Sequence, residues 1–256
     1  MKGLRVATWE EVAYYGKTLP PGLLPPIAGA TGPALVGSMG AAASSGSPTW
    51  GTGESRTAGN LLIAWSFNTT STNVGTPSGW SIGAAQVGTY TSTCFFYKVA
   101  AGGDAAPTGM GTVSQLAEFS GCAATTPRDR YGSVHATSGT QAATTAGVDA
   151  AAGELVVCAS LLYVTGTFAQ GVTFNNGAGS PSGISDATEH PCYGYGVTTG
   201  NGAADSATVT YGSYTELEIC LASFLLGAPV CTVAPAVTGT TQVGSVLSCT
   251  TGTWTG

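Results

Sequence analysis

The chain has 256 residues, and charged residues make up 8% of them, about a third of the usual share. Seven basic residues, a net charge of −6 and the lack of a basic cluster argue against a nucleic-acid partner. No apolar run approaches the roughly 20 residues of a membrane-spanning helix, and the aromatic content, 9%, is enough for a folded core. We therefore expect a folded domain with no nucleic-acid partner and no membrane span.

Residues 1–44 are predicted to form a short helix followed by a Pro-rich anchoring arm. Thr8–Glu11 fits a helix-capping box, and Gly16 would end the helix. Pro pairs at 20–21 and 25–26 favour extended backbone. Because the arm is also apolar, it suits a groove on a partner subunit or a strap across the protein's own sandwich, and both remain open. The residues expected to make these contacts are Trp9, Tyr14, Tyr15, Leu19, Leu23, Leu24 and Ile27.

Residues 45–228 are predicted to form one β-rich body made of two similar halves, at about 50–121 and 150–227. The run Ala58–Trp65 reads AGNLLIAW, and a near copy, Ala152–Ala159, reads AGELVVCA and begins 94 residues later. Two further pairs of similar segments follow in the same order, at offsets of 98 and 105 residues. Slowly growing offsets are typical of corresponding strands joined by loops of different length.

Short apolar runs separated by Gly-, Pro- and Ser-rich turns predict strands throughout this body, with no helical periodicity. Expected strands are Asn60–Phe67, Trp80–Val87, Thr91–Ala100, Val113–Phe119, Glu154–Thr165, Gln170–Phe174, His190–Thr198, Ser206–Tyr211 and Leu217–Leu226. The stretch Cys122–Ala150, rich in Thr, Ala and Gly, is interpreted as a connector. The predicted fold class is all-β, an antiparallel β-sandwich or barrel.

Four segments of the first half carry a resemblance to a known family. They read AGNLLIA (58–64), PSGWS (77–81), FYKVA (96–100) and LAEFSG (116–121). With the second copy at Ala152, they resemble the concanavalin-like jelly-roll domains of tailed-phage structural proteins and of some bacterial surface proteins. Asn60 and Glu154 depart from that pattern, in which Asp is frequent. The resemblance spans about residues 45–228 and implies a jelly-roll sandwich, often associated with virions. It supplies no active-site residue.

The C-terminal residues 229–256 differ in character from the body. Segments such as Pro235–Gly239 and Thr251–Gly256 resemble the opening of a bacterial immunoglobulin-like (Ig-like) repeat, a module common at the ends of phage and cell-surface proteins. A complete repeat needs about 100 residues. We therefore expect either the beginning of such a repeat or two strands that complete a neighbouring fold.

The sequence offers no convincing catalytic or metal site, and none is predicted; no cofactor is expected either. The two histidines, His135 and His190, are interpreted as structural loop or strand residues rather than ligands. Glu216 and Glu218 share one face of a predicted strand, a pattern compatible with a glycosidase pair but more typical of a solvated edge or an acidic contact. The seven cysteines include no C-x-x-C pair, and buried free thiols are the favoured interpretation.

These observations favour a non-enzymatic structural protein of a tailed bacteriophage, located on the exterior of the head or tail as a decoration or minor tail protein. Its expected partners are capsid or tail subunits and further copies of itself, because a weakly charged surface suits packing in an assembly. The alternative is a carbohydrate-binding or adhesin module on a phage or bacterial surface. Aromatic rings would then bind the glycan, and the candidates are Tyr193, Tyr195, Tyr211 and Tyr214.

Overall fold

The structure is a computed structural model of the whole chain. It describes residues 32–40, 48–72, 74–137, 141–144, 152–163, 171–174, 179–183, 189–198, 206–210, 215–228, 230–234, 236–238, 248–249 and 253–255. The predicted helix and the seven arm residues between Trp9 and Ile27 lie outside these described residues. In the described part every regular element is a β-strand, so no helix there could span a membrane.

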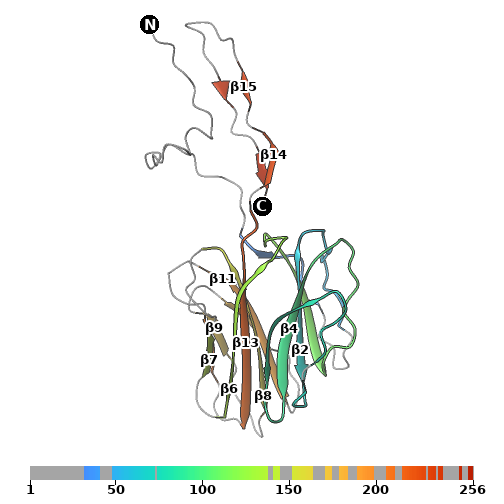
Figure 1. Cartoon of the computed structure of the whole chain (residues 1–256), viewed down its shortest axis with the longest axis vertical. Coiled ribbons are helices and arrows are strands. Elements are labelled where there is room, and N and C mark those ends of the chain that lie inside the picture. The colour runs from blue at the N-terminus through green and yellow to red at the C-terminus, as the bar shows by residue number, and fades with distance from the viewer. Residues whose placement is uncertain are drawn as a thin grey trace. The chain divides into compact units, whose positions relative to one another are not determined.

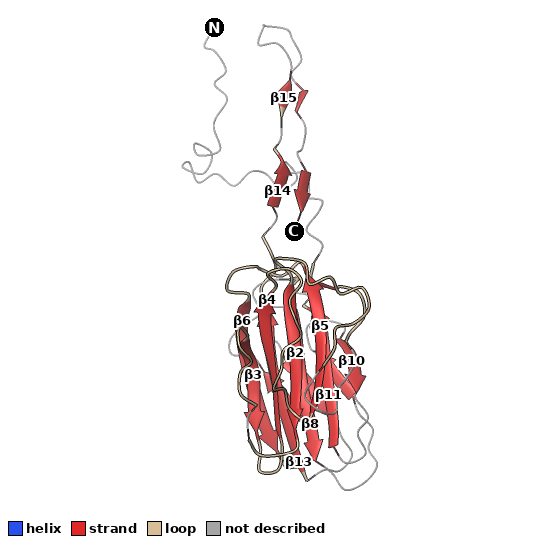
Figure 2. Cartoon of the chain, turned by 90° about the vertical axis from the view of Figure 1, so that its right-hand side faces the viewer, coloured by secondary structure: helices blue, strands red, loops and turns tan. Residues whose placement is uncertain are grey.

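The first main sheet has five antiparallel strands in the order β1-β5-β2-β4-β3. They are β1 (Ala34–Leu35), β2 (Leu61–Asn68), β3 (Ser81–Val87), β4 (Ser92–Val99) and β5 (Val113–Ser120). The second main sheet is also antiparallel, in the order β10-β11-β8-β13-β6. Its strands are β6 (Arg128–Ala136), β8 (Leu155–Tyr163), β10 (Gly179–Gly183), β11 (Glu189–Val197) and β13 (Glu216–Phe224). Figure 1 shows the two sheets side by side, and Figure 2 views the first sheet after a quarter turn.

Three smaller sheets complete the described structure. A three-stranded sheet contains β7 (Gln141–Thr144), β12 (Ser206–Thr210) and β9 (Gly171–Phe174) in that order. In the C-terminal segment, β14 (Val230–Val233) pairs with β17 (Thr253–Thr255), and β15 (Val237–Thr238) pairs with β16 (Ser248–Cys249). The chain divides into two compact units, one comprising residues 1–30 and 229–255 and the other, essentially, residues 31–228.

The main hydrophobic core lies between the two large sheets. Alternate residues of β2, from Leu61 to Phe67, face alternate residues of β8, from Leu155 to Leu161, and all belong to one buried cluster. Trp65 is fully buried in this cluster, and its indole Nε1 donates to the backbone oxygen of Cys158 in the opposite sheet (2.9 Å). The ring of Trp65 also packs on Tyr193 at 5.1 Å between centroids. The described chain therefore forms a β-sandwich, as the sequence predicts.

The central strands also bury their outer faces. On the first sheet, Leu62, Ala64 and Phe96 are covered by loop residues that include Trp80 and Met110. On the second sheet, a separate cluster that contains Val156, Cys158 and Leu221 includes Ala207 of β12. Burial on both faces explains why β2 and β8 read as continuous apolar runs instead of alternating ones.

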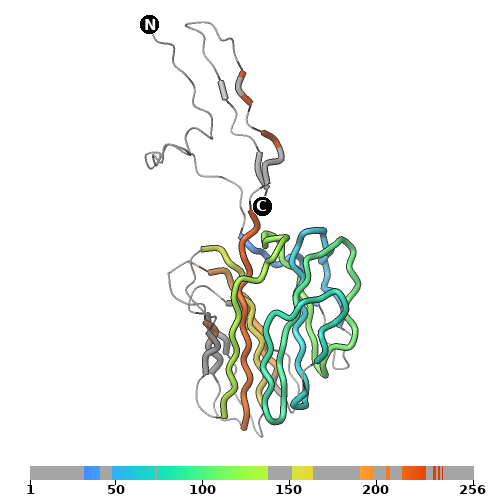
Figure 3. Tube along the Cα trace, in the orientation of Figure 1, coloured from blue at the N-terminus to red at the C-terminus, as the bar shows by residue number. Residues whose placement is uncertain are grey.

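The two sheets have the same strand order. The first sheet runs β1-β5-β2-β4-β3, and the second, counted from its β6 edge, runs β6-β13-β8-β11-β10. Strands at the same position in the two orders correspond. The three pairs of similar sequence segments fall on corresponding strands: β2 and β8, the ends of β4 and β11, and β5 and β13. Each sheet is drawn from one contiguous stretch of chain, as the colours of Figure 3 show.

The nine strands expected from the sequence are all present, with ends that agree within two residues. The interpretation of 122–150 as a connector is wrong, because β6 and β7 lie within it. β6 is an edge strand whose residues alternate between half-buried and exposed, so it lacks an apolar run. The sequence does not predict β1 or β10 either: β1 pairs with the distant strand β5, and β10 contains only Gly, Ser and Pro.

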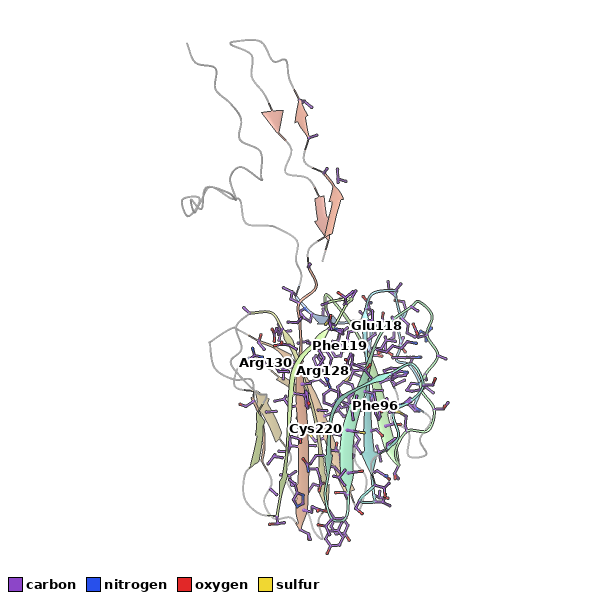
Figure 4. The ribbon with its side chains drawn as sticks, in the orientation of Figure 1. Phe96, Glu118, Phe119, Arg128, Arg130 and Cys220 are labelled. Carbon is purple, nitrogen blue, oxygen red and sulfur yellow. The ribbon has the colours of Figure 1, made fainter. Side chains whose placement is uncertain are left out.

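Arg128 joins the two sheets along one side of the sandwich (Figure 4). From β6 of the second sheet, its Nη1 donates to the carbonyl oxygens of Ile82 (2.7 Å) and Gly83 (3.1 Å) on edge strand β3. These carbonyls lie at an irregularity in the β3–β4 register. The guanidinium also lies over the ring of Tyr131, 4.5 Å from its centroid. Arg128 thus caps edge carbonyls that the ladder leaves free and holds the sheet edges together.

We expect Trp65→Ala to lower the free energy of unfolding by about 3–5 kcal/mol, because it opens a large cavity in the core and removes the cross-sheet hydrogen bond. Ile82→Ala is the control: this side chain is 42% exposed, and its truncation should change stability by less than about 0.5 kcal/mol. Urea unfolding followed by far-UV circular dichroism measures both. Equal effects of the two substitutions would contradict the central role of Trp65.

Candidate functional site

A cluster of three ionisable side chains lies where β13 begins. Glu216 and Glu218 are two residues apart on β13, so their side chains share one face of the strand. His135 on β6 is paired in register with Glu218 and presents its ring to the same face. The His135 Nδ1 atom lies 3.6 Å from Oε1 of Glu216 and 3.4 Å from Oε1 of Glu218. The alternation of β13 and its register with β6 therefore bring the three groups together.

Both carboxylates of this cluster are buried. Glu216 is 1% exposed and Glu218 is fully buried, whereas about a third of the His135 side chain is exposed. The expectation of a solvated edge at Glu216 and Glu218 is therefore wrong. Their face of β13 is directed between the two sheets, where the turn joining β3 to β4 covers it.

That turn, residues 88–91, is fastened to the second sheet through the two carboxylates. The backbone N–H groups of Thr89 and Tyr90 donate to Oε1 and Oε2 of Glu216, the second at 2.6 Å. The hydroxyl of Thr91 donates to Oε2 of Glu218 at 2.5 Å. Oε1 of Glu218 is buried and has no hydrogen-bond partner. Glu216 is thus satisfied at both oxygens, and Glu218 at one of its two.

Burial raises the pKa of Glu218 to about 8, and the nearby charge of Glu216 acts in the same direction. The hydrogen bond from Thr91 opposes this rise without cancelling it. A second buried carboxyl, Glu54, likewise has a pKa above its usual value, chiefly because of desolvation.

Glu54 belongs to a separate network that secures the loop before β2. The carboxylate of Glu118, fully buried on β5, accepts hydrogen bonds from the backbone N–H groups of Arg56 and Thr57, both at 2.8 Å, and from Nδ2 of Asn60 at 2.6 Å. Oε1 of Glu54 accepts from the backbone of Glu118. An Asp at position 60 could not donate and would place a like charge beside Glu118, which explains why Asn suits this position. This network is structural: its oxygens accept hydrogen bonds from backbone N–H groups and from the Asn60 amide.

The cluster of His135, Glu216 and Glu218 is the one group of at least three potential ligand side chains among the described residues. Each residue offers one ligand atom, and these atoms lie within 4.8 Å of one another. One nitrogen and two carboxylate oxygens are a suitable donor set for a divalent transition metal. Sequence reasoning considered all three residues but did not group them, since β6 was taken as a connector. Polar alternation in 128–136 was the signal that could have placed His135 on a strand.

The tyrosines predicted to bind glycan are only partly described. Tyr193 is 7% exposed and packs on Trp65, and Tyr195 packs edge-on against Phe119 at 4.9 Å between centroids. Both belong to or border the core between the sheets, so they do not form an exposed platform. Tyr211 and Tyr214 lie outside the described residues.

Two other tyrosines, absent from that prediction, expose about half of their surface: Tyr90 (51%) and Tyr131 (56%). The ring of Tyr90, in the turn beside Glu216, stacks on Tyr163 at 5.1 Å with 19° between planes. A separate surface hollow on the first sheet is lined by Asn68, Val74, Gly75, Gly109, Met110, Gly111 and Thr112.

The five described cysteines are free and buried, as favoured from the sequence. Desolvation raises the pKa of Cys94, Cys122 and Cys192 to about 12 and that of Cys158 and Cys220 well above its usual value. Since the thiolate is the reactive species, these five thiols are chemically inert in the folded state.

Comparison of the chain with protein-family models, with curated proteins and with solved structures found no match.

We expect Gly88→Ala to destabilise the protein by about 1–3 kcal/mol, because the added Cβ would collide with Oε1 of both Glu216 and Glu218. Gly75→Ala is the matched control, since a Cβ there meets no atom within 4 Å. Thermal unfolding of both variants measures the difference. A Gly88→Ala protein as stable as the control would show that the turn does not press on the carboxylates as described.

We expect the five described thiols to resist a colorimetric thiol reagent in the native protein and to react together on unfolding. A Cys231→Ser/Cys249→Ser double variant removes the two cysteines whose side chains are not described. Reagent consumption by this variant should be negligible in buffer and reach five equivalents in denaturant. Rapid native reaction of even one thiol would contradict its burial.

Proposed function

We propose that the chain is a non-enzymatic structural protein on the exterior of a tailed-bacteriophage head or tail. In this proposal the sandwich is the displayed body, and the N-terminal arm attaches it to capsid or tail subunits. The tail, residues 229–256, begins an Ig-like repeat, and the sandwich is a member of the phage jelly-roll group with two related halves. The resemblance of the sequence segments in 58–121 supports this assignment, and the shared strand order of the two sheets is compatible with it.

One structural observation supports the proposal most directly: the division of the chain into two units. Among the described residues, all three buried clusters lie within residues 31–228. We therefore expect this body to fold without the arm, which would leave the arm to bind a partner. On a symmetric particle, weak contacts made by many identical copies would together attach the protein firmly to the particle.

The nested pairing of the tail is compatible with the beginning of an Ig-like repeat. The ladders β14–β17 and β15–β16 follow one another within a single hairpin-like segment. Two paired strands alone are marginally stable in water. Pairing with a neighbouring fold would supply the hydrophobic face that such a ladder needs.

Glycan binding is the second candidate function. Tyr90, whose ring is exposed, suits it better than the buried Tyr193. An exposed aromatic face is a suitable platform for the apolar side of a sugar. Binding that is lost in Tyr90→Ala and kept in Tyr193→Phe would support an adhesin function. A glycan array probed with the full chain is the direct measurement.

Removal of residues 1–30 should leave the sandwich folded and abolish incorporation into particles. The deletion must stop there because Ala34 and Leu35 pair with Ser120 and Phe119 in the first sheet. Light scattering should give an oligomer for the full chain and a compact monomer for residues 31–256. An insoluble or unfolded truncation would show that the arm belongs to the protein's own core.

The location can be tested on particles purified by density gradient from a culture that carries the gene. Mass spectrometry and electron microscopy with antibodies against residues 31–228 should detect the protein on the particle surface. Detection only in the particle-free fraction would overturn the virion assignment.

A further inference from the structure

We propose that His135, Glu216 and Glu218 form a structural binding site for one divalent transition-metal ion, with Zn²⁺ as the best-suited ion. The ligand atoms would be Nδ1 of His135 and Oε1 of each glutamate. The bound ion would lock the start of β13 to β6 and, through the two carboxylates, hold the turn at 88–91 of the first sheet in place. This inference is independent of the proposed virion function.

The first argument is the unpartnered oxygen of Glu218. The side chain is fully buried, its Oε2 accepts from Thr91, and its Oε1 has no hydrogen-bond partner while it faces Nδ1 of His135. A buried acceptor without a partner is costly and needs a specific explanation. A cation bound between this oxygen, Oε1 of Glu216 and the imidazole nitrogen supplies the missing interaction.

The second argument is the spacing of the ligand atoms. A tetrahedral ion with ligand bonds of about 2.1 Å holds its ligand atoms about 3.4 Å apart. Nδ1 of His135 lies 3.4 Å from Oε1 of Glu218 and 3.6 Å from Oε1 of Glu216. Both distances are long for a hydrogen bond but match an edge of the tetrahedron around Zn²⁺. All three ligand atoms lie within 4.8 Å of one another, close enough to share one ion.

The third argument is charge. Two carboxylates are buried together, and His135 is the one basic side chain that the ion pairs of the described residues place beside them. A divalent cation with a neutral imidazole and two carboxylates makes a site of zero net charge. Neutralisation removes most of the penalty of burying two like charges side by side.

Hydrogen bonds from the 88–91 turn already orient the two carboxylates of the proposed site. Glu216 is held at both oxygens by the backbone N–H groups of Thr89 and Tyr90, and Glu218 is held by Thr91. Such second contacts fix the direction of ligand carboxylates. About a third of the His135 side chain is exposed, so the site borders solvent, and a water molecule would be the fourth ligand of a tetrahedral ion.

The test uses the full chain, stripped with a chelator and titrated with ZnCl₂ by isothermal titration calorimetry. The Cys231→Ser/Cys249→Ser background keeps those two thiols from contributing. We expect one Zn²⁺ per chain and a rise in melting temperature on binding. His135→Ala and Glu218→Gln should each weaken binding by more than about 100-fold and abolish the rise. Glu218→Gln should fold well without metal, because glutamine is uncharged and keeps the shape of the side chain.

Two control variants keep the test specific. His190→Ala removes the other histidine of the chain, and Asp129→Asn removes a carboxylate on β6 that pairs with Arg130. Both should bind Zn²⁺ like the parent protein. Co²⁺ should give the intense visible bands of a tetrahedral site in the parent and lose them in His135→Ala, whereas Mg²⁺ should not bind comparably, since it prefers an octahedral oxygen shell.

Absence of stoichiometric Zn²⁺ binding by the parent protein would overturn the proposal and identify the cluster as a hydrogen-bonded acid pair beside a histidine. Equal binding by the parent, His135→Ala and Glu218→Gln would overturn it as well, because the ion would then be held elsewhere. Mg²⁺ binding as tight as Zn²⁺ binding would overturn the assignment to a transition metal.

Discussion

Burial of both faces of the two central strands is the constraint on which the rest of this structure depends. β2 and β8 each present one apolar face to the other sheet and a second apolar face outward. Because an exposed apolar face would be unfavourable in water, each sheet needs a cover on its outer side. Loops that contain Trp80 and Met110 cover the first sheet, and β12 contributes to the cover of the second. The result is a layered body held together mainly by apolar packing, which explains how a chain with so few charges can fold.

Four of the buried carboxylates hold loops against the sheets. Glu118 and Glu54 bind the loop before β2, and Glu216 and Glu218 bind the turn between β3 and β4. In both networks a carboxylate on a strand accepts hydrogen bonds from loop residues that have no ladder partner, so loops become fixed parts of the body. The second network differs from the first in one respect. It leaves one buried oxygen of Glu218 unpartnered beside a histidine, and this difference is what points to a cation.

A body of this kind is well suited to a structural function. Its described core is complete within residues 31–228, and the loops over its outer faces are packed against the sheets. A metal ion that joins β13, β6 and the 88–91 turn would add rigidity where the two sheets meet. Rigidity and a surface of low charge are useful in a protein displayed in many copies, where repulsion between neighbours must be small.

The sequence by itself determined the fold class, nine of the strands and the similarity between segments of the two halves, because apolar runs such as 61–67 and 155–162 are local signals. It also identified Glu216 and Glu218 as residues on one face of a strand. Only the tertiary structure decided that this face is buried, since burial depends on the turn at 88–91 from the other sheet. Likewise, β6 has no apolar run and becomes a strand by pairing with β13, which is what brings His135 to the carboxylates. Long-range pairing, which local residue patterns do not encode, therefore created the candidate site.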